Sequence, residues 1–164
     1  MRRTVLCCWL IVAFSRWAEA QPPDHSSRPW HALYESGRWE KDVQAWIGDG
    51  TRSRRTADGL LVADTSPKGG SGRFYWLNWN ADPRQGAAVE ARVRAVACSQ
   101  PWGVAIMASD GVHEEGLTIY PNRLKLENAK RSVDFDAAGA PHTYRLEIKG
   151  TDVRLLADGI LLLD

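Results

Sequence analysis

The chain has 164 residues, with 21 Lys and Arg against 20 Asp and Glu, which gives a formal net charge of +1. A chain of this length is enough for one domain of ordinary size. Its balanced charge excludes the broad electrostatic attraction that nucleic acids and anionic membranes need from a partner, so neither partner is predicted.

Residues 1–20 have the pattern of a cleavable signal peptide. Two arginines precede an apolar run over residues 4–14, and the segment closes with Ala18 and Ala20 on either side of a glutamate. The apolar run is eleven residues long, well below the roughly 20 residues of a membrane-spanning helix. We predict export with cleavage after Ala20, to a secreted, periplasmic or cell-surface location without further membrane contact. A retained membrane anchor is the alternative.

Cleavage would change the composition of the chain that folds. The exported part keeps 18 Lys and Arg against 19 Asp and Glu, a net charge of −1, and its only cysteine is Cys98. No internal disulfide bond is therefore predicted. We expect Cys98 to be a small apolar side chain near the end of a strand rather than a reactive thiol.

Residues 21–45 are predicted to be a linker and a packing segment that precede the main domain. Residues 21–29 are polar and rich in proline, with little apolar surface to bury. Residues 32–46 are compatible with a short helical turn. We expect Trp30, Trp39 and Trp46 to pack the N-terminal segment onto the domain.

From Gly48 onward, short runs with alternating apolar and polar residues predict β-strands. Residues 89–95 and 142–149 show this alternation most clearly, and it is typical of strands with one buried face. Asp-Gly pairs recur between the runs and suit tight hairpin turns. The residues predicted to face the core are Val89, Ala91, Val93 and Ala95, then Leu117 and Ile119, and then Tyr144, Leu146 and Ile148.

Many short strands, regular turns and no long helical pattern predict an all-β fold, an antiparallel β-sandwich. Residues 102–108 are small and apolar on both faces, as expected of a central strand. Residues 152–164 predict a hairpin around Asp158 and Gly159, with an apolar run over residues 160–163 that only Asp164 follows. Since an exposed apolar edge invites aggregation, we expect the final strand or strands to be missing, with the sequence either a truncated gene product or a fragment of a longer protein.

Three segments, residues 57–64, 87–95 and 142–164, resemble the concanavalin A-like lectin and glucanase domains, a jelly-roll group that includes laminin G-like modules. The resemblance implies a jelly-roll β-sandwich over residues 46–164. That fold hosts lectins, polysaccharide-binding modules, glycosidases, lyases and adhesive domains, so it predicts a fold better than an activity. Leu156 departs from the group, which often has an aromatic residue before the Asp-Gly turn.

No catalytic residue or cofactor is predicted. The glucanases of this group use the strand motif Glu-x-Asp-x-x-Glu, and no glutamate of the chain begins such a motif. Glu114 and Glu115 would point to opposite faces of a strand, and we interpret them as a solvated loop. The histidines, including His113, lack the spacing of a zinc site. The resemblance allows a structural calcium ion, but no cluster of aspartates places it.

Residues 72–80 are unusually aromatic, with Phe, Tyr and two Trp on alternating faces. Alternation puts Phe74, Trp76 and Asn78 on one face and Tyr75, Leu77 and Trp79 on the other. The second set is the better candidate for the core, which leaves Trp76 and Asn78 to contact a sugar. The reversed register and core packing of both faces are the alternatives.

These observations predict a carbohydrate-binding face on one sheet of the sandwich. Its expected ligand-binding residues are Trp76, Asn78, Glu90, Arg92, Tyr120 and Arg145, with Arg94 and Glu147 beside them. Such a mixture of aromatic and charged side chains is typical of a glycan groove, although alternating Glu and Arg are also typical of a plain solvated face. We predict a lectin-like module that binds a polysaccharide or another glycan without catalysis. The alternatives are a hydrolase or lyase with unrecognised carboxylates and an adhesive protein-binding module.

Overall fold

The computed structural model describes residues 82–98 and 103–164 in full and, elsewhere, the backbone of seven strands. The strands described by their backbone are β1 (Trp9–Ile11), β2 (Tyr34–Glu35), β3 (Arg38–Trp39), β4 (Val43–Ile47), β5 (Thr51–Thr56), β6 (Gly59–Asp64) and β7 (Arg73–Leu77). The strands described with side chains are β8 (Ala87–Arg94), β9 (Val104–Ser109), β10 (Glu114–Tyr120), β11 (Arg123–Leu126), β12 (Arg131–Asp134), β13 (His142–Lys149), β14 (Asp152–Ala157) and β15 (Ile160–Leu163).

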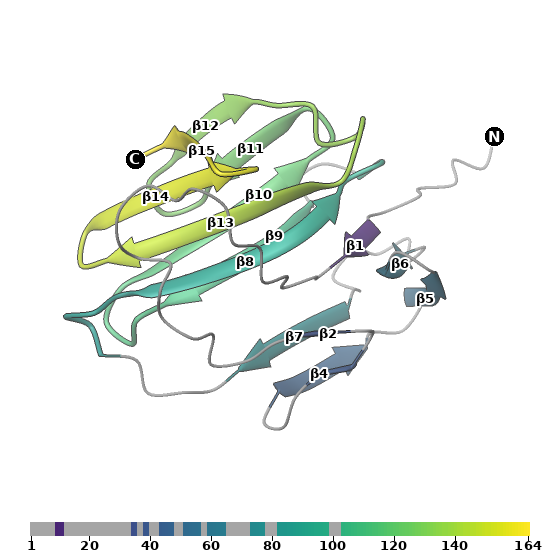
Figure 1. The fold of residues 1–164 in the computed structure, drawn as a ribbon, viewed down its shortest axis with the longest axis horizontal. Helices are drawn as coiled ribbons and strands as arrows, with labels where there is room; N and C mark the ends of the chain where they lie inside the picture. The colour runs from purple at the N-terminus through teal and green to yellow at the C-terminus, as the bar shows by residue number, and fades with distance from the viewer. Residues whose placement is uncertain are drawn as a thin grey trace.

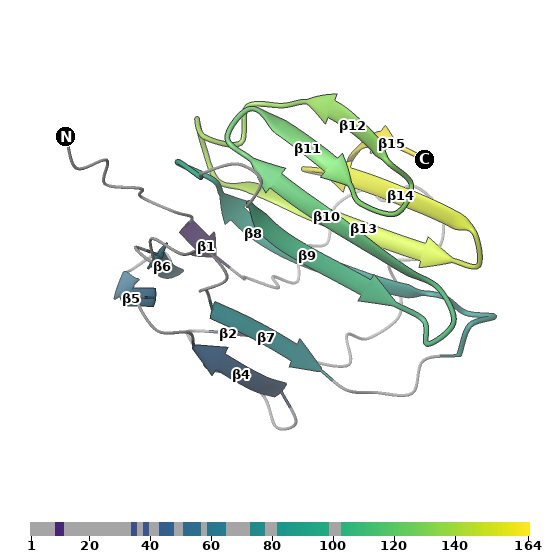
Figure 2. The same ribbon diagram turned by 180° about the vertical axis from the view of Figure 1, so that it is seen from behind.

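Two antiparallel sheets form the main body of the structure. A seven-stranded sheet has the order β15-β14-β13-β8-β1-β6-β5, and a four-stranded sheet has the order β12-β11-β10-β9. Figure 1 shows β8, β13 and β14 in front of the four-stranded sheet, and Figure 2 shows the same layers from behind. None of the described residues is helical. The predicted all-β class is confirmed for this part of the chain, and the two layers are consistent with a β-sandwich.

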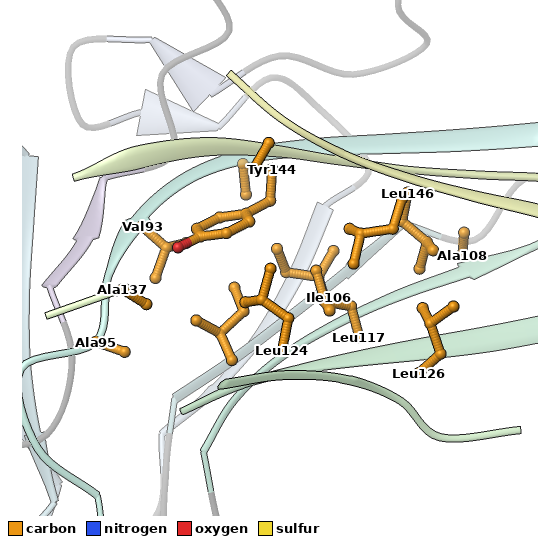
Figure 3. Close-up of a cluster of buried hydrophobic side chains, with 14 of the residues drawn as sticks. Val93, Ala95, Ile106, Ala108, Leu117, Leu124, Leu126, Ala137, Tyr144 and Leu146 are labelled. Carbon is orange, nitrogen blue, oxygen red and sulfur yellow. The ribbon is translucent and has the colours of Figure 1, made fainter. Parts of the chain in front are cut away.

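The core lies between the two sheets and is built by the alternation that the sequence predicts. Tyr144 and Leu146 of β13 are fully buried, as are Leu117 and Ile119 of β10. Figure 3 shows Tyr144 and Leu146 pointing towards side chains of the opposite sheet. Ala91 and Val93 of β8, Ala95 and Ile148 are also buried, and Val89 packs against them. A fully buried Leu or Ile contributes about 2 kcal/mol through the hydrophobic effect.

Two turns show how glycine and aspartate close the hairpins. Asp158 and Gly159 join β14 to β15 with φ angles of 49° and 80°, which are the positive values that an Asp-Gly hairpin turn requires. This hairpin is confirmed. Gly86 precedes β8 with φ 77°, and a Cβ atom there would lie 2.2 Å from the carbonyl oxygen of Ile148. No other residue type fits at Gly86, because both the backbone angle and the close approach exclude a side chain.

Two expectations about secondary structure are wrong, one about a central strand and one about a helical turn. The segment predicted as a central strand forms β9, an end strand of the four-stranded sheet, and the side chain of Met107 is 65% exposed. The small outward residues of β9 suit an edge strand as well as a central strand, so composition alone did not predict its position in the sheet. Residues 32–46 contain no helical turn among their described residues. Instead, Glu35 pairs with Arg38 between β2 and β3.

Strand β1 lies within the segment that is predicted to be a signal peptide. Its Trp9 pairs with Arg94 of β8 on one side and with Leu61 of β6 on the other. In the uncleaved chain, β1 therefore fills the position between β8 and β6. Cleavage after Ala20 would remove it and leave residues 92–94 of β8 without these backbone partners. The export of the protein remains a prediction.

Candidate functional site

The candidate site is the outer face of β8, β13 and β14, on the side of the seven-stranded sheet that faces away from the core. Because side chains alternate along a strand, the residues between the buried ones point outwards. Glu90 of β8 pairs with Arg145 of β13, and Arg145 pairs with Leu156 of β14. We call this surface the outer strip. It consists of Glu90, Arg92, Arg145, Glu147, Arg154 and Leu156.

Arg145 lies at the centre of the outer strip and contacts both of its carboxylates. Its Nε donates to Glu147 Oε1 at 2.6 Å, and its Nη1 lies 3.6 Å from Glu90 Oε2. Arg154 Nη1 lies 3.5 Å from the other oxygen of Glu147. These contacts order four charged side chains across three adjacent strands.

The central charges are largely shielded from water. The side chains of Glu90, Arg145 and Glu147 are 20%, 18% and 15% exposed, whereas that of Arg154 is 43% exposed. Burial is the largest influence on the pKa of Glu90 and raises it, Arg145 lowers it, and the net result is a raised pKa. The negative charge of Glu147 raises the pKa of Glu90 further. The carboxyl group of Glu90 therefore holds a proton more readily than an exposed glutamate.

Arg92 at the other end of the outer strip, and Arg94 next to that end, are not neutralised by any carboxylate in the described residues. Arg92 is exposed, and its guanidinium group makes no hydrogen bond or ion pair with any residue in 82–98 or 103–164. Two residues further along the same face, Arg94 Nε donates to the carbonyl oxygen of Ala138 at 2.8 Å. Thr143 lies opposite Arg92 on β13. This end is therefore cationic, while the central part is ion-paired.

The structure brings three of the six predicted ligand-binding residues together and places two others, Tyr120 and Trp76, in other sheets. Glu90, Arg92 and Arg145 share the outer strip. The expectation that Tyr120 lies on a neighbouring strand is wrong, because it belongs to β10 of the other sheet. It is 3% exposed, with the Arg123 guanidinium 4.8 Å from its ring centre. Alternation within one strand predicts faces, but it does not predict which strands become neighbours.

The aromatic segment that suggested a sugar platform lies in a separate sheet. Trp76 is on β7, which pairs with β4 and not with β8 or β13, so the expected continuity with Glu90 and Arg145 is wrong. In this pairing, Gln44 is the partner of Trp76 and Trp46 is the partner of Phe74. Asn78 and Trp79 lie outside the described residues. Which of the two aromatic faces is buried therefore stays a prediction.

Arg154 was missed as a candidate, although the sequence contains a signal for it. In residues 152–157, buried Leu155 and Ala157 alternate with Arg154 and Leu156. The same period-two pattern that predicted the outward face of residues 142–149 therefore applies to β14. The alternation was hard to recognise in β14 because this strand has aliphatic residues on both faces.

A second polar cluster surrounds the turn between β9 and β10. Asp110 is fully buried, and its Oδ1 accepts hydrogen bonds from the backbone N–H groups of Val112 and His113 at 2.9 and 2.7 Å. Its Oδ2 lies 3.2 Å from His113 Nδ1. The hydrogen bonds from the backbone of His113 and of Val112 lower the pKa of Asp110. Asp110 therefore stays ionised and fixes the orientation of the His113 ring.

Glu115 and its neighbours have a structural role that the sequence interpretation missed. Glu114 is exposed, but Glu115 is 1% exposed and its two oxygens accept backbone N–H groups from Gly116, Asn128 and Ala129 at 2.7–2.8 Å. The prediction of opposite faces is confirmed, but the interpretation of both residues as a loop is wrong because both belong to β10, and only Glu114 is solvated. The carboxylate of Glu115 holds the turn between β11 and β12. A cavity of about 220 Å³ lies beside it, lined by His113, Glu114, Glu115, Asn128, Ala129, Ile148, Gly150, Thr151 and Val153.

Within the described part of the chain, no three His, Cys, Asp or Glu side chains are grouped to hold a metal ion. The same residues include no helix that is both long and apolar enough to cross a bilayer. Cys98 is half-buried at the end of the segment that follows β8. The chain matches no protein-family model, no curated protein and no solved structure.

Proposed function

We propose that the protein is an exported, concanavalin A-like jelly roll that binds a carbohydrate chain through the outer strip without transforming it. The observation that carries this proposal is the ordered row of Glu90, Arg145 and Leu156 across three adjacent strands. Carboxylates and guanidinium groups can pair with sugar hydroxyls, and an extended row suits a polymer rather than a small molecule. The module acts alone or as an accessory part of a protein that handles polysaccharides.

The proposal rests on how these side chains are held as well as on their identity. Arg145, Glu147 and Arg154 restrain one another by ion pairs, so less side-chain entropy is lost when a ligand binds. The outer strip is also flanked by apolar surface, because Leu156 pairs with Leu161, which is 43% exposed. Polar groups that fix orientation, next to apolar surface, are a common composition for ligand sites.

The experiment is affinity electrophoresis of the secreted protein through gels that contain a panel of soluble polysaccharides. Arg154→Gln removes an exposed cation of the outer strip, and Arg84→Gln removes one that is 90% exposed and outside it. We expect one polysaccharide to retard the wild type and the Arg84 variant more than the Arg154 variant. Absence of retardation by every polymer in the panel would contradict the proposal. Trp76→Ala, run beside them, tests whether the aromatic segment contributes.

A glycoside hydrolase or lyase is the second candidate, and one observation favours it. Glu90 and Glu147 come from adjacent strands and contact the same guanidinium group, and glycoside hydrolysis uses two carboxyl groups. The raised pKa of Glu90 suits a general acid. Release of new reducing or unsaturated ends from a retarding polysaccharide, abolished by Glu90→Gln, would establish this activity.

An adhesive module is the third candidate. The end strand β15 exposes Ile160 by 67% and Leu161 by 43%, and an open strand edge with apolar side chains can pair with another chain. Sedimentation of the secreted protein alone, compared with Ile160→Lys, tests this candidate.

A further inference from the structure

The outer strip has a composition that favours one chemical class of glycan. We infer that its ligand is an acidic polysaccharide, with Arg92 binding a sugar carboxylate of the chain. This inference rests on the proposed carbohydrate-binding function and specifies its ligand.

The composition of the outer strip argues against a neutral glycan. Neutral sugars are held largely by stacking on aromatic rings, and no aromatic side chain belongs to the outer strip. Its one apolar residue, Leu156, is aliphatic. The described surface therefore offers charged contacts in place of stacking.

The charges of the outer strip are divided unevenly along it. Both of its carboxylates are already engaged, because Glu147 pairs with Arg145 and Arg154 and Glu90 pairs with Arg145. The exposed guanidinium of Arg92 has no such partner among the described residues. An incoming cation would compete with arginines for these carboxylates, whereas an incoming anion would find Arg92 available.

A carboxylate beside the outer strip, that of Asp158, is also engaged. Thr143, the partner of Arg92 in the sheet, donates its N–H to Asp158 Oδ1 at 2.8 Å. The other oxygen of Asp158 lies 2.6 Å from His142 Nδ1. Asp158 is therefore held at the turn, and it does not neutralise Arg92 by any contact seen in the described residues.

Arg92 and Arg94 together make a suitable anion site. Residues i and i+2 of a strand point the same way and are about 7 Å apart, so the two guanidinium groups lie on one face. Arg94 is fixed through its Nε by the carbonyl oxygen of Ala138. A guanidinium group binds a carboxylate through two parallel hydrogen bonds, which gives both strength and orientation. A local cationic site of this kind is compatible with the near-zero charge of the whole chain.

The test uses a matched pair of polymers with one backbone: polygalacturonate and its fully methyl-esterified form. The secreted protein is passed through gels that contain either polymer, at low and at raised ionic strength, and dissociation constants are taken from the retardation. We expect binding to polygalacturonate that is at least fivefold tighter than binding to the ester and that weakens with salt. Arg92→Gln should weaken binding to the acid about tenfold.

The variants separate a role of Arg92 in binding from an effect on the fold. Arg92 is exposed, so near-ultraviolet circular dichroism of Arg92→Gln should match the wild type. Arg92→Lys keeps the charge but loses the paired hydrogen bonds, and we expect it to restore binding only in part. Arg84→Gln, outside the outer strip, should bind as the wild type does. Unchanged binding by Arg92→Gln would overturn the assignment to this residue.

Other outcomes distinguish this inference from the proposed function. Equal retardation by the acid and its ester would overturn the inference and leave carbohydrate binding in place. Tighter binding to dextran sulfate than to polygalacturonate would overturn the assignment of a carboxylate. Equal retardation by single-stranded DNA would show general attraction to polyanions and would also overturn it. If no polymer retards the protein, both the inference and the proposed function fail.

Discussion

Arg145 Nε donates a hydrogen bond of 2.6 Å to Glu147 Oε1, two residues further along the same outward face of β13. The same guanidinium group reaches across to Glu90 on β8. One side chain thus connects two strands of the sheet and two carboxylates that would otherwise repel each other. The outer strip depends on this contact for its order, and the first prediction follows from it.

Replacement of Arg145 should destabilise the fold through the two carboxylates that it leaves behind. Arg145→Gln leaves Glu90 and Glu147, each at most 20% exposed, without this cation. We expect the free energy of unfolding to fall by about 2 kcal/mol at pH 7, between the values typical of exposed and of buried ion pairs. Urea denaturation measures it, with the exposed Arg84→Gln as the control.

The loss of stability caused by Arg145→Gln should become smaller as the pH falls. The pKa of Glu90 is raised in the fold, so its ionised form weakens stability and protonation relieves that cost. The difference between Arg145→Gln and the wild type should therefore shrink as the pH falls from 7 towards 4.5. A difference that grows over this range would contradict the account.

Glu115 and Glu114 form a matched pair for testing the buried carboxylate. Glu115→Gln replaces one accepting oxygen by a donating amide, which faces backbone N–H groups that now hold the carboxylate. We expect a loss of about 3 kcal/mol, because a buried donor is left without an acceptor. Glu114→Gln changes an exposed side chain and should have little effect. Hydrogen exchange at the amides of Asn128 and Ala129 should accelerate in the first variant alone, and equal exchange in both would refute the assigned role.

Asp110 should make the fold sensitive to acid. Its pKa is lowered by the backbone hydrogen bonds from His113 and Val112, so its contribution to stability is complete above the unfolded pKa of about 3.9 and is lost as the pH falls through the lower, folded pKa. Asp110→Asn should have a lower urea midpoint than the wild type at pH 7, with a smaller difference near pH 2.5. Asp152→Asn, at an exposed position, is the control and should show no comparable change with pH. If the urea midpoint of Asp110→Asn stays below that of the wild type by the same amount at both pH values, the lost contacts do not depend on charge.

The position of β1 gives a prediction about export. We expect the secreted protein to begin at Gln21, which mass spectrometry of the intact protein would show. Without Trp9–Ile11, the backbone amides of residues 92–94 should exchange faster than in the uncleaved chain, because β1 pairs with this part of β8. A secreted protein that still contains residues 9–11 would contradict the predicted cleavage.

Much of the fold could be predicted because alternation is a local property. The buried positions of β8 and β13 were all recognisable from residues 89–95 and 142–149, since a strand with one buried face must alternate. The hairpin at Asp158 and Gly159 was equally local, because its φ angles require those residue types. The edge position of β9 was not predictable in this way, because its apolar residues did not show how many neighbours it has.

The same distinction applies to the candidate site, where the direction of the side chains could be predicted but the neighbours of their strands could not. The outward direction of Glu90, Arg92 and Arg145 follows from the sequence alone, because each lies between residues that need burial. The folded structure was needed to show that β8 lies beside β13, which unites Glu90 with Arg145, and that Tyr120 and Trp76 belong to other sheets. The difference arises because the direction of a side chain follows from its own strand. Strand neighbours, in contrast, depend on long-range backbone hydrogen bonds and on packing of the whole chain.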